Sequence, residues 1–231
     1  LLAPDYIQHN PAVPTGAHAI IDLIPVLAES GIKVDVHRVI AEDDMVVVHS
    51  TYSNAQLLGS DTLVAFDVFR IEEGKVAEHW DNLQALAGPN PSGHSMTDGT
   101  TDITDEDKTA ENKALVAAFV ETVLQGGDAS RITDFISTKT YIQHNPQIAD
   151  GLDGLSEALA GLAEAGIDMV YARTPLIVAQ GNFVFTGSEG RLGAEPTAFF
   201  DLFRLENGRI VEHWDTVSPI PERFAHGNGK F

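Results

Sequence analysis

Hydrophobic and polar positions alternate with a period of two along two groups of short stretches in this chain. Such alternation is typical of β-strands that are buried on one face. Because short turn-like segments separate the stretches within each group, each group predicts a four-stranded antiparallel sheet. The stretches are 34–41, 44–53, 62–71 and 75–83 in the first group, and 168–178, 182–189, 196–205 and 209–217 in the second.

Apolar residues recur with the period of an α-helix outside these stretches. This pattern predicts helices at 16–31 and 151–166, and further helices at 108–125 and 129–136. Helices combined with antiparallel sheets give an α+β fold, in which each sheet curls around its helices and leaves a pocket between them. The residues expected to face the cores are Ile20, Ile24, Leu27, Leu155, Leu159 and Leu162.

The chain contains an internal repeat. The hexapeptide YIQHNP occurs at 6–11 and again at 141–146. The stretch FDVFRIEEGKVAEHWD at 66–81 returns as FDLFRLENGRIVEHWD at 200–215, with 10 of 16 positions identical. Self-similarity at this level indicates a tandem duplication of one domain.

The repeat divides the chain into two predicted domains, 1–87 and 108–231. Residues 88–107 are rich in Gly, Pro, Ser, Thr and Asp and predict a linker. Helical segments precede the second YIQHNP but not the first, so the first domain is N-terminally incomplete and lacks its first helices. Since an uncovered apolar sheet face is costly, we expect that a helical segment has been lost or that another element covers this face.

The last two strands of each domain form a hairpin that carries most of the candidate chemistry. A two-residue turn would need a positive φ at Glu73, so the sequence favours a type I turn closed by a bulge at Gly74. This turn places Asp67 opposite His79. Alternation then groups Asp67, Phe69, His79 and Asp81 on one face, repeated as Asp201, Phe203, His213 and Asp215.

Two carboxylates and one imidazole on a shared face suit acid–base chemistry. In an apolar concavity, burial and mutual repulsion push carboxylate pKa values apart. The alternative is that these groups only lock the hairpin or face solvent. The candidate catalytic residues are Asp81, Asp215, His79, His213, Asp67 and Asp201.

Each YIQHNP segment predicts a loop of defined shape before a helix, because Pro fixes its own φ and biases the preceding Asn toward extended geometry. Side chains on such a loop could bind a substrate carbonyl or hydroxyl, or could cap backbone groups instead. The candidate substrate-binding residues are Tyr6, Gln8, His9, Tyr141, Gln143 and His144.

Composition narrows the classes of partner. Thirty-four acidic against 14 basic residues give a formal charge of −20, which disfavours nucleic acids and anionic membranes. The absence of Cys removes disulfides, thiol catalysis and zinc–thiolate sites. No apolar run approaches the roughly 20 residues of a membrane-spanning helix. We expect a soluble protein with a small-molecule ligand. The cytoplasm is favoured, although a chain that starts with Leu is compatible with a removed leader.

With its YIQHNP loops and FD(V/L)FR…G(K/R)…EHWD hairpins, the chain resembles a tandem SnoaL-like protein of the nuclear-transport-factor-2-like superfamily. The YIQHNP combination resembles a bacterial subgroup of predicted aldol-condensation-catalysing enzymes. The resemblance implies two cone-shaped α+β barrels without metal or cofactor. It also implies pairing through the outer sheet faces, here as an intramolecular pseudo-dimer that could assemble into further homo-oligomers.

In SnoaL-like polyketide cyclases an Asp removes a proton α to a carbonyl, assisted by a His on the preceding strand. The resemblance assigns the role of this base to Asp81 and Asp215, whereas the assisting His is replaced by Asp67 and Asp201. The predicted function is therefore cofactor-free proton transfer at a carbonyl, in an aldol condensation or a related lyase or isomerase reaction. Two alternatives stay open, a non-catalytic small-molecule-binding pocket and a metal site built from His and Asp.

Overall fold

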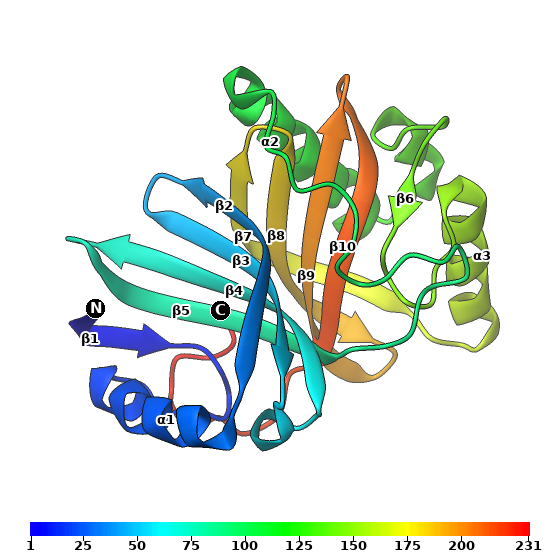
Figure 1. The fold of residues 1–231 in the computed structure, drawn as a ribbon. Coiled ribbons are helices and arrows are strands. Elements are labelled where there is room, and N and C mark those ends of the chain that lie inside the picture. The colour runs from blue at the N-terminus through cyan, green and yellow to red at the C-terminus, as the bar shows by residue number, and fades with distance from the viewer. The chain divides into compact units, whose positions relative to one another are not determined.

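A computed structural model describes all 231 residues of the chain. They form two compact units, one of Leu1–Leu86 with Thr216–Phe231 and the other of Ala87–Asp215. Each unit contains a five-stranded sheet and helices, so the chain is an α+β protein with two tandem halves (Figure 1). None of its helices is long and apolar enough to cross a membrane.

The sheet of the first unit has the strand order β1-β5-β4-β3-β2. The predicted antiparallel strands are all present, but the predicted four-stranded sheet gains a fifth strand, because β1 pairs in parallel with β5. In the first unit β1 is the first element of the sequence. The elements are β1 (Leu2–Gln8), α1 (Ala17–Ser30), β2 (Lys33–Glu42), β3 (Met45–Ser53), η1 (Gln56–Leu58), β4 (Thr62–Glu72) and β5 (Lys75–Ala85).

The second unit repeats this order as β6-β10-β9-β8-β7, with helices in front of β6. The helix predicted at 108–125 is α-helical over its first part and continues as a π-helical segment, η3. The elements are η2 (Glu106–Lys108), α2 (Thr109–Phe119), η3 (Val120–Gln125), η4 (Ala129–Asp134), β6 (Ile142–Gln143), α3 (Gly151–Glu164), β7 (Met169–Gln180), β8 (Phe183–Leu192), β9 (Glu195–Glu206) and β10 (Arg209–Pro219).

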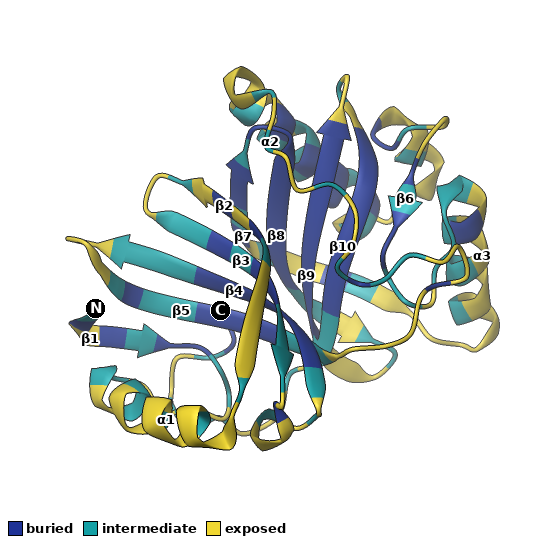
Figure 2. Cartoon of the chain, in the orientation of Figure 1, coloured by how far each residue is buried: buried dark blue, intermediate teal, exposed yellow.

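The core of the second unit lies between its sheet and the preceding helices. Val116 and Phe119 of α2 pack with Phe203 and Leu205 of β9, and all four side chains are buried. Burying a side chain of this size contributes about 1.5–3 kcal/mol. The helices therefore cover one face of this sheet, whose central strands β8, β9 and β10 are mostly buried (Figure 2).

The matching face of the first unit is less covered. Val46 and Val48 of β3 are only half-buried, and Val39 of β2 is 46 % exposed. The helix α1 has no buried residue and is mostly exposed (Figure 2). The prediction that Ile24 faces the core is wrong, because this side chain is 56 % exposed.

The register of the β4–β5 hairpin differs from the prediction. Glu73 and Gly74 both have positive φ, 49° and 74°, so the turn has two residues and pairs Glu72 with Lys75. A bulge at Ala77, next to Arg70, then shifts the pairing by one more residue.

The predicted turn is therefore wrong, but the predicted face is right. The turn and the bulge each displace the register by one residue, and a displacement of two keeps every side chain on its face. Asp67 lies opposite Asp81, and Phe69 lies opposite His79. The second unit has the same turn, with positive φ at Asn207 and Gly208.

Candidate functional site

Each unit brings two carboxylates and one imidazole together. In the first unit β4 supplies Asp67, and β5 supplies His79 and Asp81. One ring nitrogen of the histidine and one oxygen of each carboxylate all lie within 4.8 Å of one another. The second unit repeats this cluster with Asp201 from β9 and with His213 and Asp215 from β10. All three side chains of the second cluster are buried.

Gln143 determines the protonation of His213. Its Oε1 accepts the backbone N–H groups of His144 and Asn145, both at 3.0 Å, so the carbonyl oxygen of this amide faces inward. That oxygen lies 2.9 Å from Nδ1 of His213, which must therefore donate a proton. On the other side of the ring, Nε2 lies 3.0 Å from Oδ1 of Asp201. Because an amide oxygen and a carboxylate face the two nitrogens, the surroundings favour the imidazolium form of the ring.

The surrounding charges agree with this protonation. Burial lowers the pKa of His213, but the hydrogen bond to Asp201 and the charges of Asp215 and Asp201 outweigh burial and raise the pKa. Phe203 stacks on the ring with centroids 4.9 Å apart and limits its movement. In the first unit the pKa of His79 is raised through the same balance, with Asp67 at 3.1 Å and Gln8 at 3.1 Å.

The two oxygens of Asp215 have different surroundings. Oδ2 accepts a hydrogen bond of 2.7 Å from Nδ2 of Asn145, whereas Oδ1 is buried and accepts none. In the first unit Asn10 holds Oδ2 of Asp81 at 2.6 Å, and Oδ1 again accepts no hydrogen bond. A carboxylate that is fixed through one oxygen and bare at the other is arranged as a proton acceptor.

Burial adjusts the basicity of Asp215. Burial raises its pKa, the positive charge of His213 lowers it, and the negative charge of Asp201 raises it again, with a net increase. A carboxylate with a raised pKa is a stronger base than an exposed aspartate, which suits general base catalysis near neutral pH.

A tyrosine hydroxyl lies near each of these aspartates. The hydroxyl oxygen of Tyr141 accepts a hydrogen bond of 3.3 Å from Nε2 of Gln143, and no residue accepts its proton. Burial and the charges of Asp215 and Asp201 raise its pKa, so the hydroxyl keeps its proton at neutral pH. Tyr6 and Gln8 repeat this arrangement at 3.0 Å in the first unit.

The histidines of the YIQHNP loops lie elsewhere. Nε2 of His9 contacts Glu78 at 2.9 Å, and the ring stacks on Trp80 with centroids 5.0 Å apart. Side chains alternate along the loop, so Gln8 and Asn10 reach the cluster while His9 turns to the other face of the sheet. His144 likewise contacts Glu212 and stacks on Trp214. The structure therefore does not place His9 and His144 with the other candidates.

Sequence reasoning missed four residues of these sites. Asn10 and Asn145 were interpreted only as turn-forming residues. Both copies of the repeat have Asn at this position, and this could have marked them as site residues. The other two are Tyr52 and Tyr171, whose hydroxyls donate to Asp67 at 2.7 Å and to Asp201 at 3.4 Å. They come from β3 and β7, at positions that do not match in the repeat, so no pattern in the sequence pointed to them.

Three groups of side chains have spacings that would suit a metal ion, namely the two clusters and the group His94, Asp98 and His144. A metal ligand must be an unprotonated nitrogen or an ionised oxygen. A metal bound to Nε2 of His213 would have to displace the proton shared with Asp201.

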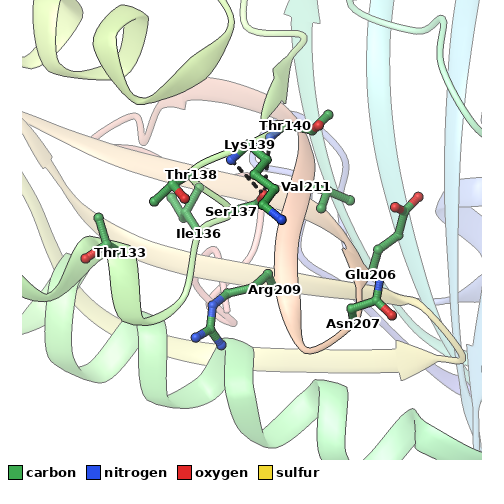
Figure 3. A pocket seen from close by; sticks show the side chains of 10 residues that line it. All are labelled: Thr133, Ile136, Ser137, Thr138, Lys139, Thr140, Glu206, Asn207, Arg209 and Val211. Carbon is green, nitrogen blue, oxygen red and sulfur yellow. Dashed lines mark hydrogen bonds between the residues drawn. The ribbon is translucent and has the colours of Figure 1, made fainter.

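A pocket of about 440 Å³ lies at a different place in the second unit (Figure 3). Residues 137–140 line one side and the β9–β10 turn lines the other, with Arg209 and Glu206 at its edge. None of the clustered residues contributes to its lining. This pocket is separate from the candidate site.

Comparison with known proteins gives one family match. Residues 1–79 and 116–213 match the family described as SnoaL-like domain. No curated protein matches the chain.

Among solved structures, TsrD from Streptomyces laurentii shares 26 % identity over 36 % of this chain and 70 % of its own, with a TM-score of 0.31. A protein of unknown function with a cystatin-like fold from Xanthomonas campestris shares 23 % identity over 46 % of this chain and 90 % of its own, with a TM-score of 0.40. An LEH-like epoxide hydrolase of M. tuberculosis shares 21 % identity over 48 % of this chain and 85 % of its own, with a TM-score of 0.37.

Proposed function

The chain belongs to the family of SnoaL-like domains, and from this premise we propose that each unit catalyses proton transfer next to a carbonyl group of a small organic molecule, without a cofactor. One observation carries the proposal. Each site holds a buried aspartate, Asp81 or Asp215, with one oxygen fixed by an asparagine and the other bare.

The first step is removal of a proton. Oδ1 of Asp215 takes a proton from the carbon next to the carbonyl group, and the electron pair of the broken C–H bond moves toward the carbonyl oxygen. The enolate that forms carries its negative charge on this oxygen. The hydroxyl of Tyr141 donates a hydrogen bond to it, and such a donor stabilises charge that develops in the transition state.

The second step uses the enolate. In an aldol reaction its carbon forms a bond with a second carbonyl carbon, and Asp215 returns its proton to the new alkoxide. In an isomerisation the same proton returns to a different carbon. Both routes begin with the same proton removal, and neither requires an oxidant or a reductant.

His213 acts through its neighbours in this scheme. Both ring nitrogens are engaged, by Gln143 and Asp201, so the ring has no free N–H group for a ligand. Its positive charge lies beside Asp215 and favours the ionised base. In the first unit Asp81, Tyr6, His79 and Asp67 take the corresponding roles.

The double variant Asp81→Asn with Asp215→Asn tests the proposal. Asn keeps the shape and the contact with Asn10 or Asn145 but cannot accept the proton. Proton–deuterium exchange next to the carbonyl of a panel of ketones, followed by NMR in D2O, should fall at least about 100-fold. Thermal unfolding of the variant serves as the control for the fold.

Two results would count against the proposal. Exchange that persists in the double variant would mean that neither aspartate is the base. Ligand binding by the unmodified protein without any exchange would instead support a non-catalytic binding pocket.

A further inference from the structure

The segment that follows β10 lies over the first site. We call residues 225–231 the C-terminal strap. Three of its hydrogen bonds reach the YIQHNP segment: Ala225 N to Pro11 O at 2.8 Å, His226 Nε2 to Asn10 O at 3.0 Å and Asn228 Nδ2 to Gln8 O at 2.9 Å.

The segment that follows β5 has the same relation to the second site. We call residues 90–99 the linker strap. Asn90 Nδ2 donates to the carbonyl oxygen of Ile148 at 2.9 Å, and Ser92 Oγ accepts the backbone N–H of Asp150 at 2.8 Å. Each site is therefore bordered by a strap that forms hydrogen bonds with the YIQHNP loop or the turn just after it.

The two straps can be aligned through their contacts. His9 Nδ1 contacts the carbonyl oxygen of Gly229 at 3.0 Å, and His144 Nδ1 contacts that of Ser95 at 2.8 Å. Gly229 and Ser95 thus occupy the same place in their units.

The preceding residues agree with this alignment. Asn228 contacts Thr15 at 3.1 Å, and His94 contacts Asp150 at 3.2 Å. Thr15 and Asp150 correspond, because each accepts the backbone N–H of the loop glutamine, Gln8 or Gln143. The next residues of the straps, Lys230 and Met96, therefore also correspond.

These two residues differ in charge. Lys230 is 7 % exposed, and its Nζ donates to the backbone oxygen of Asp81 at 2.6 Å and lies 3.9 Å from the bare Oδ1. Met96 is 1 % exposed and carries no charge. A buried ammonium without a nearby anion would be costly, so this pair is an ionic feature that only the first site has.

We propose that Lys230 is a fixed counter-ion of Asp81, which makes the first site less negative than the second, where Met96 stands at the corresponding strap position. The catalytic consequence rests on the proposed function, whereas the charge pairing does not. The other polar groups around Asp81 are Asn10, Tyr6, Tyr52, Asp67 and His79.

The difference also affects the ligand. With His79 and Lys230 protonated, the charges of the first cluster cancel, whereas those of the second leave one negative charge when both its aspartates are ionised. The first site is therefore suited to a carbonyl compound that carries a carboxylate, which the second site would repel.

Lys230→Met tests the proposal, because it gives the C-terminal strap the residue found at the corresponding position of the linker strap. The pKa of Asp81 is followed by 13C NMR of its side-chain carboxyl group, with Asp81→Asn to assign the signal. Removing a cation this close should raise the pKa by about one to three units. Lys230→Arg keeps the charge and should leave the pKa near its starting value.

The exchange Met96→Lys is the reverse test and does not depend on the fold of the Lys230→Met variant. It should lower the pKa of Asp215. An unchanged Asp81 pKa in Lys230→Met, or an unchanged Asp215 pKa in a folded Met96→Lys protein, would overturn the proposal. If instead the pKa values move as expected but no variant exchanges protons, the counter-ion stands and the proposed function fails.

Discussion

A single amide decides the charge state of the imidazole in each site. Gln143 can present either its oxygen or its nitrogen to His213, and two backbone N–H groups of the loop fix the oxygen inward. The histidine is therefore a donor at both nitrogens, next to two aspartates. Both ring nitrogens are thus engaged, whereas Oδ1 of Asp215 accepts no hydrogen bond.

The raised pKa values of His79 and His213 predict how stability depends on pH. The folded protein favours the protonated rings more than the unfolded chain does. Their contribution is complete below the unfolded pKa of about 6.5 and is lost as pH rises through the higher folded pKa values. The raised pKa of Asp215 acts in the same direction from about 3.8 upward.

The thermal unfolding midpoint should thus fall by a few degrees as pH rises above about 6.5. Differential scanning calorimetry in buffers of matched ionic strength measures this change. The double variant His79→Gln with His213→Gln should flatten the dependence. A midpoint that rises over this range in the unmodified protein would contradict the assignment.

At the scale of elements, the hairpins differ in how well their turn residues fit. Glu73 and Asn207 occupy the same turn position with φ of 49° and 50°. Asn tolerates this left-handed conformation, whereas Glu is strained in it. The first hairpin therefore carries a local cost that the second avoids.

Exchanging these residues gives a matched pair of variants. Glu73→Asn should stabilise the protein by about 1 kcal/mol, and Asn207→Glu should destabilise it by a similar amount. Chemical denaturation with equal m-values measures both. Equal effects of the same sign would show that the turn conformation is not the cause.

The hairpins also show what the sequence could and could not predict. Period-two alternation predicted which side chains share a face, because a register error of two residues leaves faces unchanged. The alternation could not predict the turn, because strand pairing offsets the cost of the strained conformation at Glu73. The edge strands β1 and β6 were missed because the YIQHNP segment has the sequence pattern of a loop. Its pairing with β5 or β10 depends on tertiary contacts. Lys230 was missed because it lies 149 residues from Asp81.

At the scale of the whole molecule, the duplication has produced two sites that share a cluster and differ in their straps. If both proposals hold, each site has its own pH range. Asp215→Asn leaves only the first site working, and Asp81→Asn leaves only the second. The Asp215→Asn protein should therefore remain active to lower pH than the Asp81→Asn protein.

Rates of exchange measured against pH for the two single variants test this prediction. Lys230→Met combined with Asp215→Asn should move the profile of the first site toward that of the second. Superimposable profiles for the single variants would mean that the straps do not set the ionisation of the bases.

The position of Lys230 in the chain has a consequence for biosynthesis. The ribosome completes the strands around Asp81 long before it reaches Lys230, which comes 149 residues later. At about 5–20 residues per second this interval lasts roughly 7–30 s. During translation the strands around Asp81 therefore exist before Lys230 does, and a nascent polypeptide stalled before Lys230 would carry an aspartate without its cation.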